Sequence, residues 1–145
     1  MDSGGWTDSF NTDFDGWTPV SGEWAWLSSF TPWQGSTGYG VLYSGTTNVW
    51  RCIFKDFVFS PGEYTVTAIM HIVVDIVLRE QAGRIDVDST TLGYWDDSWY
   101  PAIWHARTTS PLSFSSTGAH NIQVCSTAWS ETRASYIDEI SIGCD

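Results

Sequence analysis

Aromatic rings and carboxylates alternate in one short stretch, Gly93–Trp104, which holds five aromatic residues and two aspartates among turn-forming residues. An indole or phenol ring has a flat apolar face that can lie against the C–H face of a sugar, and a polar edge that can hydrogen-bond. A neighbouring carboxylate can accept hydrogen bonds from hydroxyl groups. The composition of this stretch therefore predicts a surface that binds a carbohydrate.

The candidate rings and the carboxylate share turn-rich surroundings, where polar backbone groups keep a segment near solvent. They are Trp33, Trp95, Asp97, Trp99, Tyr100, Trp104 and Trp129. The polar candidates on strand-like segments are His71, Asp75, Arg79, Asn121 and Gln123. Each has a structural alternative: a ring can plug the end of the fold, a single histidine is commonly a satisfied structural residue, and Arg79 can pair with Glu80 at an edge.

Ten tryptophans, six tyrosines and seven phenylalanines in 145 residues exceed what a small core can hold. The tryptophans expected to be mainly structural are Trp6, Trp17, Trp24 and Trp26. Trp50 shares a strand face with Cys52 and Phe54, so it belongs either to the core or to the floor of a binding groove. The remaining rings are free for binding.

The charge of the chain narrows the choice of ligand. Six Lys and Arg residues stand against 17 Asp and Glu residues, giving a formal net charge of −11. Proteins bind a phosphate backbone chiefly by neutralising it with Lys and Arg, so nucleic acid and anionic membrane surfaces are not expected partners. The longest apolar run, about Ala68–Leu78, is too short for a membrane helix and is interrupted by His71 and Asp75.

No catalytic constellation is recognised. Glycoside hydrolysis needs two carboxylates facing each other, whereas the adjacent Asp96 and Asp97 tend to point apart. The chain has no Gly-x-Ser-x-Gly, His-Glu-x-x-His or phosphate-loop motif. The spacing of His71, His105 and His120 suggests no metal site. We therefore expect a binding protein rather than an enzyme, with a small lyase or hydrolase as the weakest alternative.

The three cysteines, Cys52, Cys125 and Cys144, allow at most one internal disulfide and leave one spare thiol. A bridge between Cys125 and Cys144 is conceivable if the last two strand-like segments form a hairpin. The pairing stays open at this level. No two cysteines have the short spacing of a zinc or redox site.

The fold class expected is all-β, a two-sheet antiparallel β-sandwich. Runs rich in Val, Ile, Thr and aromatic residues recur every 8 to 12 residues or so between turn formers. The candidate strands are Ser9–Asn11 with Trp17–Pro19, Glu23–Ser28, Gly38–Tyr43, Val49–Phe59, Glu63–Val73, Ile76–Glu80, Arg84–Asp88, Ile103–Thr108, Leu112–Phe114, His120–Ser126 and Tyr136–Ile142. Gly35–Gly40 and Asp88–Pro101 are expected to be long surface loops.

No internal repeat or linker divides the chain, so residues 1–145 are expected to form a single domain. Ser60-Pro61-Gly62 predicts a turn, since Pro presets φ and Gly tolerates positive φ. After it, Tyr64, Val66, Ala68 and Met70 share one strand face. The start of the chain has no secretion signal, yet few lysines and strong acidity favour a mature segment of a secreted, extracellular protein over an intracellular one.

Three segments, taken in order, resemble one family. They are Ser9-Phe10-Asn11-Thr12-Asp13-Phe14-Asp15-Gly16-Trp17, Phe57-Val58-Phe59-Ser60-Pro61-Gly62-Glu63-Tyr64-Thr65-Val66 and Tyr136-Ile137-Asp138-Glu139-Ile140-Ser141-Ile142. They are similar to the Phe-Glu…Gly-Trp opening, the Pro-Gly-x-Tyr turn and the closing Ile-Asp-Asp-Val-Ser strand of jelly-roll carbohydrate-binding modules. Such modules are appended to glycoside hydrolases and polysaccharide lyases. The closing strand with Cys144 is also similar to MAM-type adhesion domains.

The resemblance to carbohydrate-binding modules implies a structural Ca²⁺ between the opening segment and the closing strand. Its residues here would be Asn11, where the family has a Glu, and Asp138, with Asp8 or Asp13 as compensating carboxylates. Calcium takes six to eight oxygen ligands, among which a neutral amide can serve. In the alternative, Asp138 only caps a strand end.

If catalysis is set aside, two candidate functions remain. The first is non-catalytic binding of a polysaccharide or oligosaccharide through surface rings, targeting an attached or partner enzyme to its substrate. The second is a structural or adhesive extracellular, virion or fibre module, whose rings bury in protein–protein contacts.

Overall fold

The computed structural model describes residues 5–11, 13–19, 23–27, 38–43, 50–72, 82–95, 104–127 and 134–144. The predicted strand Ile76–Glu80 lies outside these residues. The described residues form strands and turns, with no helix among them. Within this part of the chain, accordingly, no helix is long and apolar enough to cross a membrane.

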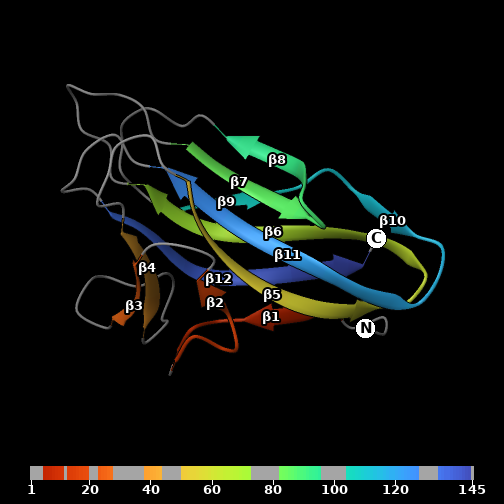
Figure 1. Ribbon diagram of the computed structural model, residues 1–145, viewed down its shortest axis with the longest axis horizontal. Helices are drawn as coiled ribbons and strands as arrows, with labels where there is room; N and C mark the ends of the chain where they lie inside the picture. Colours follow the sequence, from red (N-terminus) through yellow and green to blue (C-terminus); the bar gives the residue numbers. More distant parts are fainter. Residues whose placement is uncertain are drawn as a thin grey trace.

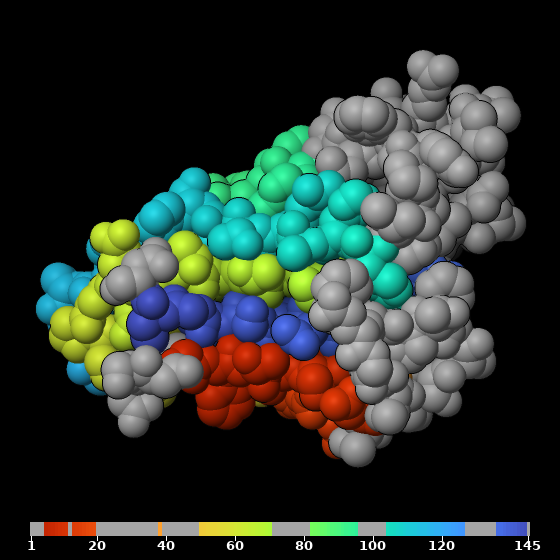
Figure 2. All heavy atoms as spheres, turned by 180° about the vertical axis from the view of Figure 1, so that it is seen from behind, coloured from red at the N-terminus to blue at the C-terminus, as the bar shows by residue number. Residues whose placement is uncertain are grey.

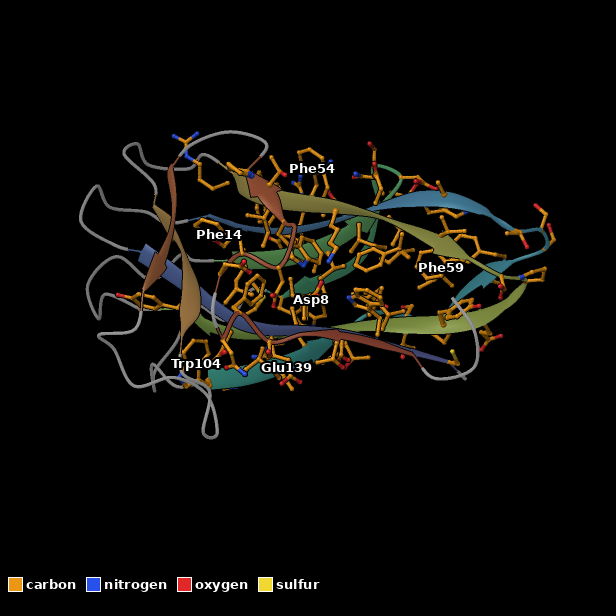
Figure 3. All side chains as sticks on the ribbon, turned by 90° about the horizontal axis from the view of Figure 1, so that it is seen from below. Asp8, Phe14, Phe54, Phe59, Trp104 and Glu139 are labelled. Atoms are coloured by element: carbon orange, nitrogen blue, oxygen red, sulfur yellow. A yellow bond between two sulfur atoms is a disulfide. The ribbon has the colours of Figure 1, made fainter. Side chains whose placement is uncertain are left out.

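The strands form two antiparallel sheets that face each other (Figure 1, Figure 3). The five-stranded sheet has the order β2 (Thr18–Pro19), β5 (Arg51–Phe59), β11 (Gly118–Thr127), β7 (Ala82–Val87) and β8 (Thr90–Trp95). The seven-stranded sheet is built on β6 (Gly62–Ile72) and β12 (Ala134–Cys144). The jelly-roll β-sandwich predicted from the sequence is therefore confirmed.

The edges of the seven-stranded sheet are assembled from short strands. On the free side of β6 lie β9 (Trp104–Thr108) and β10 (Leu112–Phe114). On the free side of β12 lie β1 (Trp6–Asp8) and β4 (Tyr39–Tyr43), and β3 (Glu23–Leu27) pairs with β4 beyond it. This sheet therefore spans a broad surface, with β6 and β12 as its long central strands.

Alternation along each strand decides which side chains enter the core. In β6 the inward residues are those expected from the sequence: Tyr64, Val66, Ala68 and Met70, each at most 3% exposed. The facing sheet and β12 supply apolar partners to the same cluster, among them Ile53, Phe57, Phe59, Ile122, Val124, Ile137, Ile140 and Ile142. The intervening residues form the two outer faces, where a ligand can reach them.

The disulfide joins Cys52 to Cys125, which are directly opposite each other on β5 and β11. The Cys125–Cys144 pairing considered from the sequence is wrong, because β11 and β12 belong to different sheets and form no hairpin. Cys144 lies exposed at the end of β12, opposite Tyr64. The bridge thus ties the central strand of the five-stranded sheet, β11, to its neighbour β5.

The segment expected as a loop from Asp88 contains a strand instead. Asp88 and Ser89 both have positive φ, 49° and 66°, and make the two-residue turn of the β7–β8 hairpin. A turn with positive φ at both central residues matches the twist of paired strands. The Thr, Gly and turn-forming composition after Asp88 conceals this hairpin in the sequence.

The first strand also differs from the expectation. Trp6–Asp8 pairs with β12, whereas the predicted Ser9–Asn11 is not part of a strand. Phe10 has φ of 53°, in the left-handed region, which ends an extended strand. The chain therefore turns away from the sheet directly after Asp8 and forms the loop that leads to β2.

Candidate functional site

Most of the predicted site residues lie outside the described residues: Trp33, Asp75, Arg79, Asp97, Trp99, Tyr100 and Trp129. For His71, only the backbone is described, and it pairs with Trp104. Their roles stay predictions. The candidates that can be placed are Trp95, Trp104, Asn121 and Gln123.

Trp95 faces the interior rather than solvent. It lies opposite Gly83 on β7, and its half-buried ring packs against the core cluster. A Cβ added to Gly93 would overlap this indole ring, so the glycine makes room for it. The ring of Trp95 is thus only partly accessible, and its part in ligand binding stays a prediction. The segment is a strand, and alternation turns Trp95 inward and its neighbour Tyr94 outward.

Trp104 and Gln123 are not brought together. Trp104 begins β9 on the outer face of the seven-stranded sheet, which it shares with Thr108, whose hydroxyl is 2.8 Å from that of Thr67. Gln123 lies opposite Phe54 on the other sheet. In Figure 3, Phe54 and Trp104 lie on opposite sides of the sandwich. The expected site is thus divided between two faces.

The outer face of the five-stranded sheet gathers the groups that a carbohydrate site needs. Paired residues form three rows across the strands of this sheet, which faces the viewer in Figure 1. The first row is Cys52, Cys125, Arg84 and Tyr94; the second is Thr18, Phe54, Gln123, Asp86 and Thr91; the third is Asp56 and Asn121. Neighbouring rows are about 7 Å apart, because two residues of a strand rise that far.

Among the described residues of this face, Tyr94 has the most exposed ring, with 58% of the residue accessible. The indole of Trp50 meets it edge-on, with ring centroids 6.1 Å apart. The guanidinium of Arg84 lies over the Trp50 ring, 4.4 Å from its centroid. Tyr94 is therefore held beside a packed aromatic–cation unit while its own ring stays open to solvent, as stacking on a sugar requires.

Asp86 fixes the orientation of Arg84. Its Oδ2 accepts a hydrogen bond from Arg84 Nε at 3.0 Å, and its Oδ1 accepts one from Thr91 Oγ1 at 2.8 Å. The residue is only 4% exposed although it lies on the outer face. Both carboxylate oxygens are thus engaged, and the charge of Arg84 is balanced by an immediate neighbour. Sequence reasoning missed Tyr94, Arg84 and Asp86, whose alternation in two short strands was the available signal.

The far end of the same face is polar and acidic. Asn121 donates from Nδ2 to Asp56 Oδ1 at 2.8 Å and from its backbone amide to Asp88 Oδ1 at 2.9 Å. His120 Nδ1 lies 2.5 Å from Asp88 Oδ2, and this hydrogen bond, more than that of the Asn121 amide, lowers the pKa of Asp88, against the opposing effect of burial. Asp88 is therefore held as a carboxylate that can accept from hydroxyl groups.

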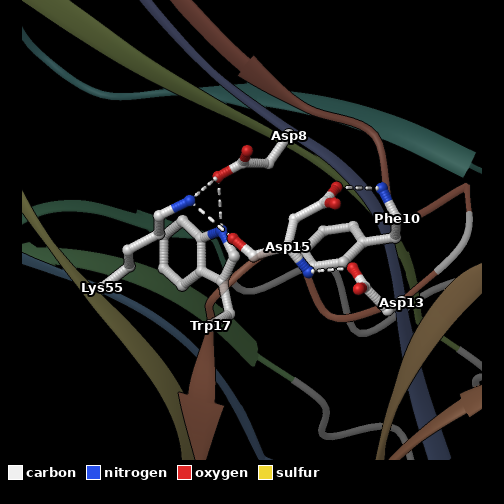
Figure 4. A network of polar contacts seen from close by, with 6 residues as sticks. All are labelled: Asp8, Phe10, Asp13, Asp15, Trp17 and Lys55. Atoms are coloured by element: carbon white, nitrogen blue, oxygen red, sulfur yellow. Dashed lines mark hydrogen bonds and ion pairs between the residues drawn. The ribbon is translucent and has the colours of Figure 1, made fainter.

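A separate polar network closes the side of the sandwich near β1 (Figure 4). The inward-pointing Lys55 of β5 places its ammonium 2.8 Å from Asp8 Oδ2 and 2.5 Å from the carbonyl oxygen of Asp15. The Trp17 indole N–H donates to the same Asp8 oxygen at 2.9 Å. Trp17, expected to be structural, is 4% exposed. Lys55 thus links the five-stranded sheet to β1 and to the loop that follows it.

This network bears on the calcium site expected from the family resemblance. Asp8 is already paired with Lys55, and Asp13 accepts a hydrogen bond from the Asp15 amide at 2.8 Å, so both compensating carboxylates have other roles. Asp138 is 1% exposed at an irregularity of the β12–β6 pairing, whereas Asn11 is exposed. No three His, Cys, Asp or Glu side chains of the described ranges are grouped to hold a metal. By themselves these residues do not make a complete calcium site.

The opposite outer face differs in character. Figure 2 shows β9 and β10, β6, β12 and β1 side by side across it. Register places hydroxyl side chains in one row over four strands: Thr108, Thr67, Ser141 and Thr7. Trp104 lies in a different row, opposite His71, which in turn is opposite Tyr136. The hydroxyl row itself has short side chains and no ring on which a sugar could stack. The exposed ring of Tyr94 makes the five-stranded sheet the better candidate for a ligand site.

Comparison with known proteins gives a likeness of fold only. No protein-family model matches the chain, and neither does any curated protein sequence. Among solved structures, the chain is similar to the carbohydrate-binding module CBM36 in complex with calcium and xylotriose, at TM-score 0.62 and 11% identity, covering 95% of this chain and 99% of that one.

Two further structures show the range of proteins with this fold. The CBM22-1-GH10 modules of Clostridium thermocellum xylanase Xyn10B, complexed with xylohexaose, match at TM-score 0.67 and 16% identity, over 96% of this chain and 28% of that one. The K1 cleaved adhesin domain of Lys-gingipain from Porphyromonas gingivalis matches at TM-score 0.69 and 11% identity, over 97% of this chain and 98% of that one. The chain therefore has the jelly-roll fold of carbohydrate-binding modules, a fold that it also shares with an adhesin domain.

Proposed function

We propose that the protein is a non-catalytic module that binds a glycan on the outer face of its five-stranded sheet. The observation that carries the proposal is the exposed Tyr94 ring beside the Trp50–Arg84 stack, with hydrogen-bonding groups in the rows beyond it. Flat rings with nearby polar groups are the pattern by which sites orient a small polar ligand. The oligosaccharide complexes of similar folds support the same reading.

The test is a binding titration of Tyr94→Ala and Tyr94→Phe against oligosaccharides such as xylohexaose. Loss of the ring removes apolar contact worth about 1–2 kcal/mol, which weakens binding by about five-fold to thirty-fold. Tyr94→Phe keeps the ring and should bind nearly as well as the parent. Because Tyr94 is exposed, neither change should unfold the protein.

Val58→Ala is the matched control. Val58 is also 58% exposed and lies on an outer strand face, but it pairs with Ala119 at the far end of β5 from Tyr94. It should leave the affinity unchanged. Full retention of binding in Tyr94→Ala, or an equal loss in both variants, would remove this face as the site.

The wider role that we propose is to hold an attached or partner enzyme at its polysaccharide, outside the cell. The xylanase match supports this, since its module is joined to a GH10 module. The rings outside the described residues, such as Trp99 and Trp129, belong to the same proposal as further contacts. Pull-down on insoluble polysaccharide, with each of these rings changed to Ala in turn, tests their part.

Calcium belongs to the proposal as a structural ion, held by Asp138 and Asn11 with further oxygen donors. The calcium complex of the CBM36 module supports it. Thermal unfolding with and without a chelator tests it: the midpoint should fall on chelation in the parent and should not respond in Asp138→Asn. An unchanged midpoint in the parent would exclude a stabilising ion.

A second candidate function, adhesion to protein, is favoured by the adhesin match. It predicts concentration-dependent assembly or capture of a protein partner, with no response to glycans. Light scattering beside a glycan array separates the two functions.

A further inference from the structure

The charges on the outer face of the five-stranded sheet point to a particular class of ligand, and this step rests on the proposed function. The cations of β5 do not reach this face. Lys55 points inward to Asp8, and Arg51 lies on the same, inward side of the strand because side chains alternate along it. Arg84 is thus the cation that the described strands place there. Asp86 lies beside it, and the carboxylates of Asp56 and Asp88 lie farther along the same face.

Arg84 is not available as a free positive charge. Its Nε is bound by Asp86 at 3.0 Å, and its guanidinium is stacked on Trp50. Asp86 in turn is 4% exposed, so water screens this pair weakly. A carboxylated or sulfated sugar approaching the face would meet a compensated guanidinium and, further along, the carboxylates of Asp56 and Asp88.

We infer that the face selects uncharged glycans and that Asp86 is the residue that sets this specificity. Paired with Asp86, Arg84 serves to support the aromatic platform and to donate from its remaining N–H groups to hydroxyl oxygens. The carboxylates of the third row and its neighbouring turn accept from sugar hydroxyls. A neutral sugar supplies both donors and acceptors, whereas an anionic one brings like charges together, which is unfavourable.

The experiment compares neutral and acidic ligands on the same protein. Xylohexaose and β-1,4-galactan represent uncharged glycans; polygalacturonate and a sulfated glycan represent anionic ones. We expect the parent to bind a neutral ligand at least ten-fold more tightly than either anionic one, with little change between 50 mM and 500 mM salt. Tighter binding of an anionic ligand would overturn the inference and leave the proposed function intact. Binding of neither class would remove both.

Asp86→Asn tests the residue itself. The amide can still accept from Arg84 Nε and can donate to Thr91 Oγ1, so both hydrogen bonds persist while the charge is lost. We expect affinity for polygalacturonate to rise about ten-fold or more and to become salt-dependent, and the ratio of anionic to neutral affinity to rise with it. A variant that remains folded but shows no gain would overturn the role of Asp86.

Asp56→Asn/Asp88→Asn provides the second measurement, on exposed residues whose change should leave the fold intact. Removing these two charges should raise the affinity for the anionic ligand by a smaller factor than Asp86→Asn does, because they lie farther from Arg84. An equal or larger gain would show that the overall acidity of the face, rather than Asp86, determines the preference.

Discussion

Replacing Lys55 by Met removes the cation that joins the two sheets beside β1. The ammonium has contacts to Asp8 Oδ2 at 2.8 Å and to the Asp15 carbonyl at 2.5 Å, and it also lies 5.0 Å from the Trp6 ring centroid and 5.3 Å from that of Phe57. Met keeps the length of the aliphatic chain. The change therefore isolates the loss of charge and of two hydrogen bonds.

The expected cost follows from what is left behind. The Asp8 side chain is 8% exposed, so without Lys55 its carboxylate remains buried, with the Trp17 N–H still donating to it. Breaking a buried ion pair by removing one partner costs about 3–5 kcal/mol. Lys55 itself is 19% exposed, which lets water reach part of the site. We expect a loss of about 3 kcal/mol, or about 10 °C in the unfolding midpoint for a chain of this size.

Urea unfolding of the parent, Lys55→Met, Asp8→Asn and the double variant measures this as a thermodynamic cycle. In the double variant no buried charge is left alone, and an Asn at position 8 can still accept from Trp17, so it should be more stable than Lys55→Met by about 1–2 kcal/mol. The reasoning is refuted if Lys55→Met lies within 1 kcal/mol of the parent, or if the double variant is the least stable of the four.

Three other changes give independent checks. Removing the Cys52–Cys125 bridge as a double Ser variant should destabilise the protein by up to about 4 kcal/mol, because the bridge closes a separation of 73 residues; equal urea midpoints with and without reductant would contradict this. The lowered pKa of Asp88 means that its stabilising contribution is complete above its unfolded pKa of about 4 and is lost as the pH falls through the folded value. Asp88→Asn should therefore flatten the stability curve below pH 4, and an unchanged acid limb would count against the His120 hydrogen bond. Gly93→Ala should cost about 1–3 kcal/mol by pushing the neighbouring indole off the core, which a thermal midpoint equal to that of the parent would exclude.

The sandwich was predictable because its determinants are local. Tyr64, Val66, Ala68 and Met70 alternate over a long strand that begins at a Pro-Gly turn, and this pattern alone establishes which face enters the core. The Asp88-Ser89 turn was hidden because neither residue is Gly or Asn, the usual signals of positive φ. Without this hairpin, the sequence does not show which of the residues that follow point outward and which point to the core.

The candidate site was predictable in kind but not in place. An aromatic–carboxylate stretch indicated a sugar-binding surface. Whether a ring is exposed, however, depends on which side of the strand it lies, and the adjacent residues Tyr94 and Trp95 lie on opposite sides. Partners such as Trp50, Arg84 and Asp86 come from strands far apart in the chain, and only the sheet order brings them together. The divided positions of Trp104 and Gln123 follow from the same order.

The Cys52–Cys125 bridge has a mechanical consequence. Strands β6 to β10 lie entirely between its two cysteines, which themselves belong to β5 and β11. Tension applied to the two ends of the chain passes through the covalent link rather than through this intervening segment. A module pulled by its two ends would begin to unravel from the strands outside the bridged segment, β1 to β4 and β12, while the β7–β8 hairpin with Tyr94 would be spared the pull.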